Sequence, residues 1–117
     1  QTIFITGASS GLGKAAAQLF QSRGWRVIAT MRTPENWIMT LITLDVTNEV
    51  QVADTFQKAI AISPIDVVFN NAGYGLVGPF EAYSSSQITR QIDTNLTGVL
   101  RVAHPFVRYF RENGIKG

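Results

Sequence analysis

Cysteine is absent from this sequence and histidine occurs only once, and each shortage excludes some chemistry. Without cysteine there are no disulfides, no thiolate metal sites and no cysteine nucleophile. His104 has no second histidine with which to share a metal, so a packed or hydrogen-bonded side chain is expected there. The sequence therefore predicts no metal site.

Charge and long hydrophobic runs are also scarce. Charged residues make up 15% of the chain, and 10 scattered basic residues against 8 acidic ones leave a net charge of +2. No basic patch for nucleic acid is expected from this balance. The apolar stretch at residues 2–6 is interrupted at once by Gly7, which argues against a signal peptide or a membrane span. The expectation is a cytoplasmic protein without membrane or nucleic-acid partners.

The residues that are present suit one globular domain. Hydrophobic residues make up 45% of the 117 residues, which is enough to form a core. Short β-branched runs alternate with longer segments of helical periodicity, and this alternation predicts βαβ units around a parallel sheet. The expected fold class is α/β, a doubly wound parallel sheet in three layers formed by residues 1–117.

Strands are expected at residues 2–6, 26–30, 39–44 and 65–69. Helices are expected at residues 12–23, from an N-cap at Asn48 to Pro64, and at residues 86–111 with a kink at Pro105. Core-facing positions in the three helices, in order, are expected at Leu12, Ala15, Ala16, Leu19 and Phe20; at Val52, Phe56, Ala59 and Ile60; and at Ile88, Ile92, Leu96, Leu100, Ala103, Val107 and Phe110.

Two features predict that this fold is incomplete at its C-terminal end. The link from Arg32 to Met39 is shorter than a parallel crossover normally needs, so it is either a compact loop or lacks part of the sequence. The chain also stops at residues 114–117, where a helix ending leads toward what looks like a fifth strand.

The strongest motif is TGASSGLG, residues 6–13, between the first strand and the first helix. Gly7 allows a sharp turn, Gly11 allows close approach to a pyrophosphate, and Gly13 allows tight helix packing. The free N–H groups of the helix start would face the diphosphate. The alternative is a glycine-rich turn without a ligand. The cofactor-binding residues predicted here are Thr6, Gly7, Ser9, Ser10, Gly11, Leu12 and Gly13.

The glycine spacing 7, 11 and 13 resembles the T-G-x-x-x-G-x-G pattern of the short-chain dehydrogenase/reductase family. Three further segments are similar to family motifs in the same order: Asp45-Val46, the N-N-A-G motif at residues 70–73, and the helix segment at residues 93–98. Together the motifs cover nearly the whole chain. The resemblance implies a Rossmann-type fold that binds a nicotinamide dinucleotide.

The resemblance also implies roles for the residues after the third and fourth strands. Asp45 would accept from the adenine amino group while Val46 packs against the ring; the alternative for Asp45 is an acid placed at a helix N-terminus by the dipole. Asn71, Ala72 and Gly73 would line the cofactor, and Asn70 would mostly brace the fold. Turn chemistry is the alternative for both asparagines.

Asn95 is the catalytic residue that the resemblance implies. It lies in a predicted helix, and asparagine is a poor helix former, so a role in forming the helix explains it less well than a functional role. In the family this asparagine joins a proton relay by holding a water near a catalytic lysine.

The cofactor preference follows from the end of the second strand. An NAD site needs an acid there to bind the ribose hydroxyls, whereas a basic side chain suits the 2′-phosphate of NADP. Arg32 stands at this place and no acid follows until Glu35, so NADP(H) is predicted over NAD(H). A solvated surface arginine is the alternative. The family often adds a second basic residue just before the middle glycine, where this chain has Ser10.

The catalytic tyrosine and lysine of the family are missing from this chain. Four residues after Tyr74, Tyr83 and Tyr109 stand Gly78, Gln87 and Asn113, so no Y-x-x-x-K exists. The catalytic serine, tyrosine and lysine would lie beyond residue 117. The prediction is the dinucleotide-binding half of an NADP(H)-dependent oxidoreductase, inactive alone. A non-catalytic dinucleotide sensor is the alternative, and a methyltransferase would not explain the N-N-A-G motif.

Partners and substrate are predicted less sharply. The family pairs subunits through the long helix that carries Asn95, which implies a homodimer or homotetramer, and Val99 and Phe106 are expected to be exposed on its outer side. Apolar Leu76, Val77 and Phe80 predict that residues 74–83 border the mouth of a site for a nonpolar carbonyl or alcohol. A packed loop would explain the same residues.

Overall fold

Four parallel strands form the centre of the molecule. The computed structural model describes residues 1–33 and 39–116. β1 (Thr2–Ile5), β2 (Arg26–Met31), β3 (Thr40–Thr43) and β4 (Val67–Phe69) pair in the order β3-β2-β1-β4. This confirms the predicted α/β fold with its parallel sheet, with strand ends shifted by one or two residues. Residues 34–38 of the short link before β3, including Glu35, lie outside the described part.

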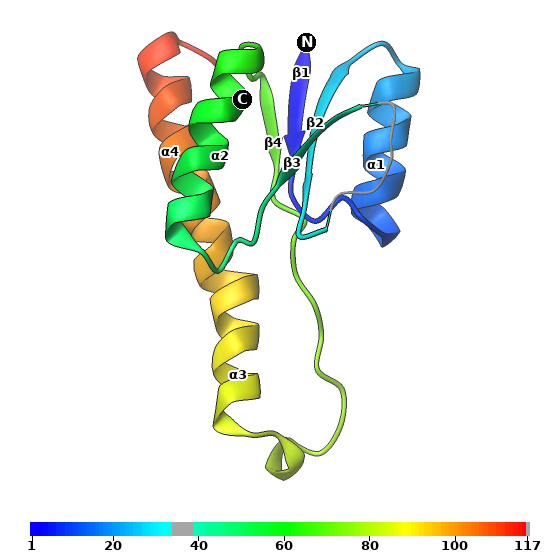
Figure 1. The fold of residues 1–117 in the computed structure, drawn as a ribbon, viewed down its shortest axis with the longest axis vertical. Helices are drawn as coiled ribbons and strands as arrows, with labels where there is room; N and C mark the ends of the chain where they lie inside the picture. Colours follow the sequence, from blue (N-terminus) through cyan, green and yellow to red (C-terminus); the bar gives the residue numbers. More distant parts are fainter. Residues whose placement is uncertain (34–38, 117) are drawn as a thin grey trace.

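Helices cover both faces of the sheet, which gives three layers (Figure 1). α1 (Gly11–Ser22) lies on one face, and α2 (Glu49–Ile62) and α4 (Gly98–Asn113) lie on the other. α3 (Ser85–Ile92) extends beyond the carboxyl edge of the sheet, after a long connection that contains the short 3₁₀ turn η1 (Phe80–Ala82). The connection from β3 to β4 crosses to the other side of β1 through α2, on the face of the sheet opposite α1. The strand order therefore reverses next to β1, and an open α/β sheet binds its ligand at the carboxyl ends of the strands at such a point.

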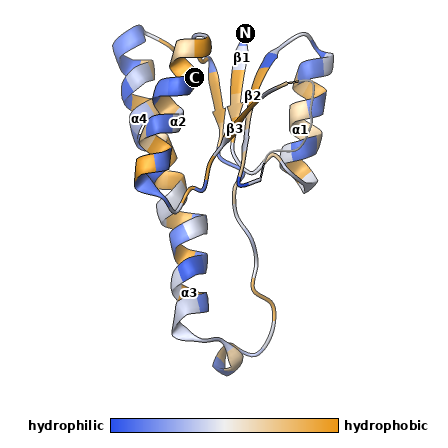
Figure 2. Ribbon diagram, viewed as in Figure 1, coloured by the Kyte–Doolittle hydropathy of each residue, from blue (hydrophilic) through white to orange (hydrophobic). Residues whose placement is uncertain are grey.

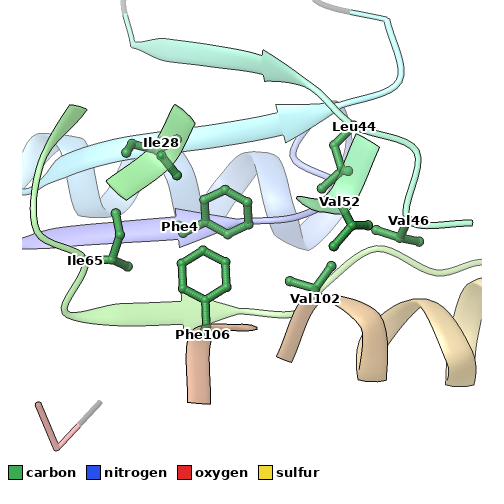
Figure 3. Close-up of a cluster of buried hydrophobic side chains, with 9 residues drawn as sticks. Phe4, Ile28, Leu44, Val46, Val52, Ile65, Val102 and Phe106 are labelled. Atoms are coloured by element: carbon green, nitrogen blue, oxygen red, sulfur yellow. The ribbon is translucent and has the colours of Figure 1, made fainter. Parts of the chain in front are cut away.

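Alternate residues of the strands feed two separate cores, as the two-residue period of a strand requires. Ile3 and Ile5 pack with Ala17 beneath α1, whereas Phe4 packs on the opposite face. There the rings of Phe4 and Phe106 lie 4.8 Å apart, and Figure 3 shows them facing each other inside the cluster. Figure 2 shows the strongest hydrophobic colouring on the strands and mixed colouring on the helices.

The predicted core-facing side of the last helix is largely wrong. Ile92, Leu96, Leu100 and Val107 are 52%, 59%, 60% and 64% exposed. The buried positions of α4 are Gly98, Val102 and Phe106, so the prediction that Phe106 is exposed is also wrong, and Val99 is half-buried. The helix carries two apolar stripes, and periodicity alone does not tell which stripe faces the chain's own sheet.

The other helices follow the sequence more closely. Asn48 is the N-cap of α2, and its side chain accepts from the Gln51 amide as predicted. All the core positions predicted for α2 pack in or against the core. In α1, Leu12 and Leu19 are 79% and 50% exposed, contrary to the prediction, and Ala17 takes the buried place.

The long helix is interrupted at Asp93 rather than at Pro105. A π-helical turn, η2 (Asp93–Thr97), joins α3 to α4, and the amide of Gly98 reaches back to the Asp93 carbonyl. α4 runs on through Pro105. Such single π turns widen a helix locally and often accompany functional sites. This one places the wide turn around Asn95.

Candidate functional site

A cavity of about 730 Å³ lies at the carboxyl edge of the sheet, on the ends of all four strands. This volume is in the range of cofactor sites. The predicted cofactor residues that line it are Gly7, Ser9, Ser10, Gly11, Leu12, Arg32, Asp45, Val46, Asn71, Ala72 and Gly73. Thr6, Gly13 and Asn95 do not line it, but each contacts a residue that does.

Two glycines of the turn at residues 6–13 are required by close contacts. Gly7 has φ +64°, and a Cβ there would lie 2.7 Å from the Ala72 Cα. A Cβ on Gly13 would collide with the side-chain Nδ2 of Asn71 and with the Gly7 carbonyl oxygen. Gly13 therefore lets α1 pack against the turn and against Asn71, and any larger residue would push these elements apart.

The start of α1 presents unused hydrogen-bond donors to the cavity. Ser10 is the N-cap, but its side chain makes no capping hydrogen bond, and no acidic residue stands in the first turn. Ser9 and Ser10 are exposed and line the cavity. Free N–H groups, two hydroxyls and the positive end of the helix dipole together suit a diphosphate.

Thr6 and Asn71 fasten this turn to the segment after β4. The Thr6 hydroxyl oxygen accepts from the amides of Asn71 and Ala72, each at 3.0 Å. The Asn71 side chain donates to the carbonyls of Thr6 at 3.2 Å and Gly7 at 3.0 Å. The bracing bonds expected of Asn70 are thus made by Asn71, which also lines the cavity. Asn70 Oδ1 is buried without a partner among the described residues.

Asp45 is fixed by Thr47 at the far wall of the cavity. Its Oδ1 accepts from the Thr47 hydroxyl at 2.7 Å and from the Thr47 amide at 2.9 Å. The hydroxyl bond, with further help from the amide bond and the positive charges of Arg32 and Arg90, holds the Asp45 pKa below its usual value. Because Asn48 caps α2, Asp45 is not the acid at that helix start. The carboxylate is therefore ionised at neutral pH and able to accept another hydrogen bond.

Val46 and the π turn hold each other in place. Gly98 lies so close to Val46 that a Cβ on the glycine would lie 2.6 Å from the Val46 Cγ2. Arg101 donates to the Val46 carbonyl at 3.3 Å and pairs with the Asp93 carboxylate at 2.7 Å. The half-buried guanidinium therefore links the wall formed by Val46 to the helix turn that carries Asn95.

The Asn95 side chain is bound to the backbone of Tyr74. Asn95 Oδ1 accepts from the Tyr74 amide at 2.9 Å, and Nδ2 donates to the Tyr74 carbonyl at 2.6 Å. A Cβ on Gly73 would lie 3.0 Å from the same oxygen, so a larger residue before Tyr74 would press on the Asn95 side chain. Asn95 is a positioning residue for the segment after β4; its role in a water relay remains a prediction.

The cavity also includes residues that the sequence reasoning missed. Three of them lie on the long helix: Gln87 and Arg90 on α3, and Thr94 on the π turn. Arg90 and Thr94 lie four residues apart and so share a face of the helix. This helical spacing from the Asn95 segment is the signal that could have identified them. Within residues 1–33 and 39–116, no group of acidic and histidine side chains forms a metal site. None of the helices in those ranges is long and apolar enough to cross a bilayer.

Comparison with known proteins identifies the family to which this chain belongs. A family model described as short chain dehydrogenase matches residues 1–117. An uncharacterised oxidoreductase of Schizosaccharomyces pombe is 38% identical over 99% of this chain and 42% of its own length. A 3-ketodihydrosphingosine reductase of Bacteroides thetaiotaomicron is 36% identical over 96% of the chain and 43% of its own length. A serine 3-dehydrogenase of Agrobacterium fabrum is 36% identical over 88% and 46%.

Solved structures agree in fold. A short chain dehydrogenase from Bacillus anthracis superposes with a TM-score of 0.92 at 28% identity, covering 100% of this chain and 54% of that one. A 4-hydroxyisoleucine dehydrogenase in complex with NADH gives a TM-score of 0.91 at 25% identity, covering 100% and 52%. The chain thus spans less than half the length of these curated relatives and about half of these solved chains.

Proposed function

Because this chain belongs to the short-chain dehydrogenase family, we propose that it is the cofactor-binding part of an NADP(H)-dependent oxidoreductase. The reaction would transfer a hydride between nicotinamide and a carbonyl or alcohol carbon. The observation that carries the proposal is the cavity, because the glycine turn, Asp45 and Asn71 surround one space at the carboxyl edge of the sheet. A dehydrogenase and a reductase stand among its relatives, which supports an enzyme rather than a sensor.

The residues present fit a nicotinamide dinucleotide. The uncapped start of α1 offers donors for the diphosphate. Asp45 keeps a lone-pair site for the adenine amino group, beside the buried side chain of Val46. When bound, the nicotinamide supplies or receives the hydride. The chain's own residues bind and orient the cofactor, and Asn95 and Arg101 hold the walls around it.

Arg32 is the basis for the preference for NADP(H). It follows β2, is exposed and lines the cavity, and neither Met31 nor Thr33 beside it is acidic. A guanidinium at this place suits a 2′-phosphate and does not replace the acid that binds ribose hydroxyls. The 4-hydroxyisoleucine dehydrogenase complex contains NADH, so the preference is proposed for this chain on Arg32 and not by likeness.

A titration of the purified protein with both cofactors tests this function. Calorimetry should show binding of NADP⁺ about tenfold or more tighter than of NAD⁺, the difference expected for one well-placed charged contact. Arg32→Gln should reduce the ratio, and Arg23→Gln, at the end of α1 and away from the cavity, serves as the control. Equal or tighter binding of NAD⁺ would contradict the preference. Binding of neither cofactor would contradict the proposal as a whole.

Turnover is proposed to need residues that this chain does not contain. None of its tyrosines is followed four residues later by lysine. A nicotinamide absorbance assay with the 117-residue chain and simple ketones or alcohols should therefore show cofactor binding without turnover. Turnover by the chain alone would show that another of its groups can act as the acid and base.

The exposed stripe on the long helix supports a homodimer or homotetramer. Ile92, Leu96, Leu100 and Val107 follow one another along α3, η2 and α4 and remain more than half exposed in the single chain. An exposed apolar stripe with this helical spacing is suited to burial against a second copy of the chain. Light scattering should give at least twice the monomer mass, and Leu100→Glu should lower it. Val50→Glu, 79% exposed on α2, is the control. A monomer in both the wild type and Leu100→Glu would contradict the proposal.

The loop after β4 supports a nonpolar substrate. Leu76 lines the cavity, and Val77 and Phe80 are 98% and 76% exposed nearby along the chain. Exposed apolar side chains at a cavity mouth favour an apolar ligand. A panel of aliphatic and polar carbonyl compounds, assayed with the complete enzyme, should show lower KM for the aliphatic members. The reverse order would contradict this choice.

A further inference from the structure

We propose that Arg90 is a second cation of the 2′-phosphate subsite, reaching it from α3, whereas Arg32 reaches it from the end of β2. This inference rests on the proposed preference for NADP(H). It concerns a residue outside the motifs of the sequence analysis, on the helix that precedes the π turn.

The position of Arg90 is the first support. Arg90 lines the same cavity as Arg32, although the two come from different elements, α3 and the end of β2. Thr94, one helical turn further on, lines the cavity as well. The face of α3 that carries Arg90 is therefore the face turned toward the cofactor space.

The charges around the cavity are the second support. Arg32, Asp45 and Arg90 are its charged lining residues, and both arginines act on the Asp45 carboxylate to lower its pKa. All three groups therefore lie within range of one another's charge, at the end of the cavity where Asp45 is proposed to meet the adenosine. Asp45 Oδ1 is bonded to Thr47, and the guanidinium group of neither arginine forms a hydrogen bond or ion pair with another described residue. Among residues 1–33 and 39–116, two guanidinium groups and one carboxylate line that end, which leaves a net positive charge there.

This excess of positive charge matches a dianion rather than a neutral ribose. A 2′-phosphate presents three acceptor oxygens and close to two negative charges, which two guanidinium groups bind better than one. Ser10, which lines the cavity on the glycine turn, carries no charge. Arg90 adds a second positive charge from another element, α3.

Calorimetric titration of the full-length protein with NADP⁺ and NAD⁺ tests the role of Arg90. Arg90→Gln should weaken NADP⁺ binding about three- to tenfold, the range for a partly solvated charged contact, and leave NAD⁺ within about twofold of the wild type. Arg90→Lys should retain part of the preference, because it keeps the charge but not the planar fork. The same selectivity should appear with 2′,5′-ADP against 5′-AMP, which lack the nicotinamide.

Controls separate this inference from the function on which it rests. Arg23→Gln removes an exposed arginine outside the cavity and should change neither affinity. Thermal unfolding checks that each variant is folded. A wild type that binds NAD⁺ at least as well as NADP⁺ overturns the proposed preference. A wild type that prefers NADP⁺, with a ratio unchanged in Arg90→Gln, overturns the role of Arg90 alone. An equal loss of both cofactors in Arg90→Gln also overturns it, because the contact would then not be with the 2′-phosphate.

Discussion

Asn95 holds Tyr74 by both polar groups of its backbone, accepting from the amide at 2.9 Å and donating to the carbonyl at 2.6 Å. The two residues are 21 positions apart, so these bonds close the long connection between β4 and α3. An asparagine amide imitates the pairing of a neighbouring strand, since it offers one acceptor and one donor side by side. The wall formed by Gly73 and Tyr74 is fastened to the π turn in this way.

Asn95→Ala should release that wall. We expect a loss of about 1 kcal/mol in the free energy of unfolding, because two exposed hydrogen bonds disappear. Hydrogen exchange of the Tyr74 amide should become faster. Asn113→Ala removes an asparagine side chain that donates to the helix carbonyl of Tyr109, and it should leave Tyr74 unaffected. An unchanged exchange rate in Asn95→Ala would show that other contacts hold the wall.

Gly13→Ala should damage the cofactor cradle. The added methyl group would overlap the Asn71 amide and the Gly7 carbonyl, so we expect a loss of about 1–3 kcal/mol in stability from overpacking. Cofactor affinity measured by calorimetry should fall with it. Gly75→Ala is the matched control, because nothing lies within 4 Å of a Cβ there. Equal effects of the two substitutions would contradict this account of Gly13.

The pKa of Asp45 should depend on Thr47. The threonine hydroxyl bond is the largest cause that holds this pKa below its usual 3.8. A depressed pKa in the folded state stabilises the protein above the unfolded pKa, and this contribution is lost as the pH falls through the folded value. Thr47→Val should raise the Asp45 pKa toward 3.8, lower the stability at neutral pH and reduce the part of it that is lost on acidification. Carbon-13 NMR of the Asp45 carboxyl group measures its pKa. An unchanged pKa in Thr47→Val would rule out the hydroxyl bond as the cause.

Two adjacent residues of α4 should differ sharply in their contribution to stability. Phe106 is 2% exposed and contacts Phe4 and Phe56, so Phe106→Ala should cost about 3–5 kcal/mol. Val107 is 64% exposed, so Val107→Ala should cost about 0.5 kcal/mol or less in the isolated chain. Urea unfolding below the concentration at which chains associate measures both. A similar cost at the two positions would contradict the finding that Phe106, and not Val107, lies on the core-facing side of this helix.

The fold was predictable because its local signals agree. The β-branched runs marked the strands, Asn48 capped α2 as expected, and the motif at residues 6–13 lay between a strand and a helix. The glycine spacing also predicted the tight packing at Gly13, where a Cβ would collide with the Gly7 carbonyl oxygen. Each of these features depends on a few neighbouring residues, which a sequence displays directly.

The features that the sequence did not reveal depend on contacts between distant segments. Two apolar stripes on α4 read equally well as a core face, and only the docking of Phe106 on Phe4 decides between them. The exchange of roles between Asn70 and Asn71 depends on which amide points toward Thr6. Arg90 lies one helical turn before Thr94, but that this face of α3 is turned toward the ends of the strands is shown only by the packing of the folded chain.

The bonds between Thr6 and Asn71 have a consequence for the thermodynamics of binding. They connect the turn after β1 to the segment after β4, so this floor of the cavity is already assembled before a ligand arrives. Little conformational entropy remains to be lost there when a ligand binds. The connection from Tyr74 to Ser84 is long, and Asn95 holds it at its first residue. The entropic cost of binding should therefore fall on that connection, which makes its composition a means of tuning affinity without altering the floor.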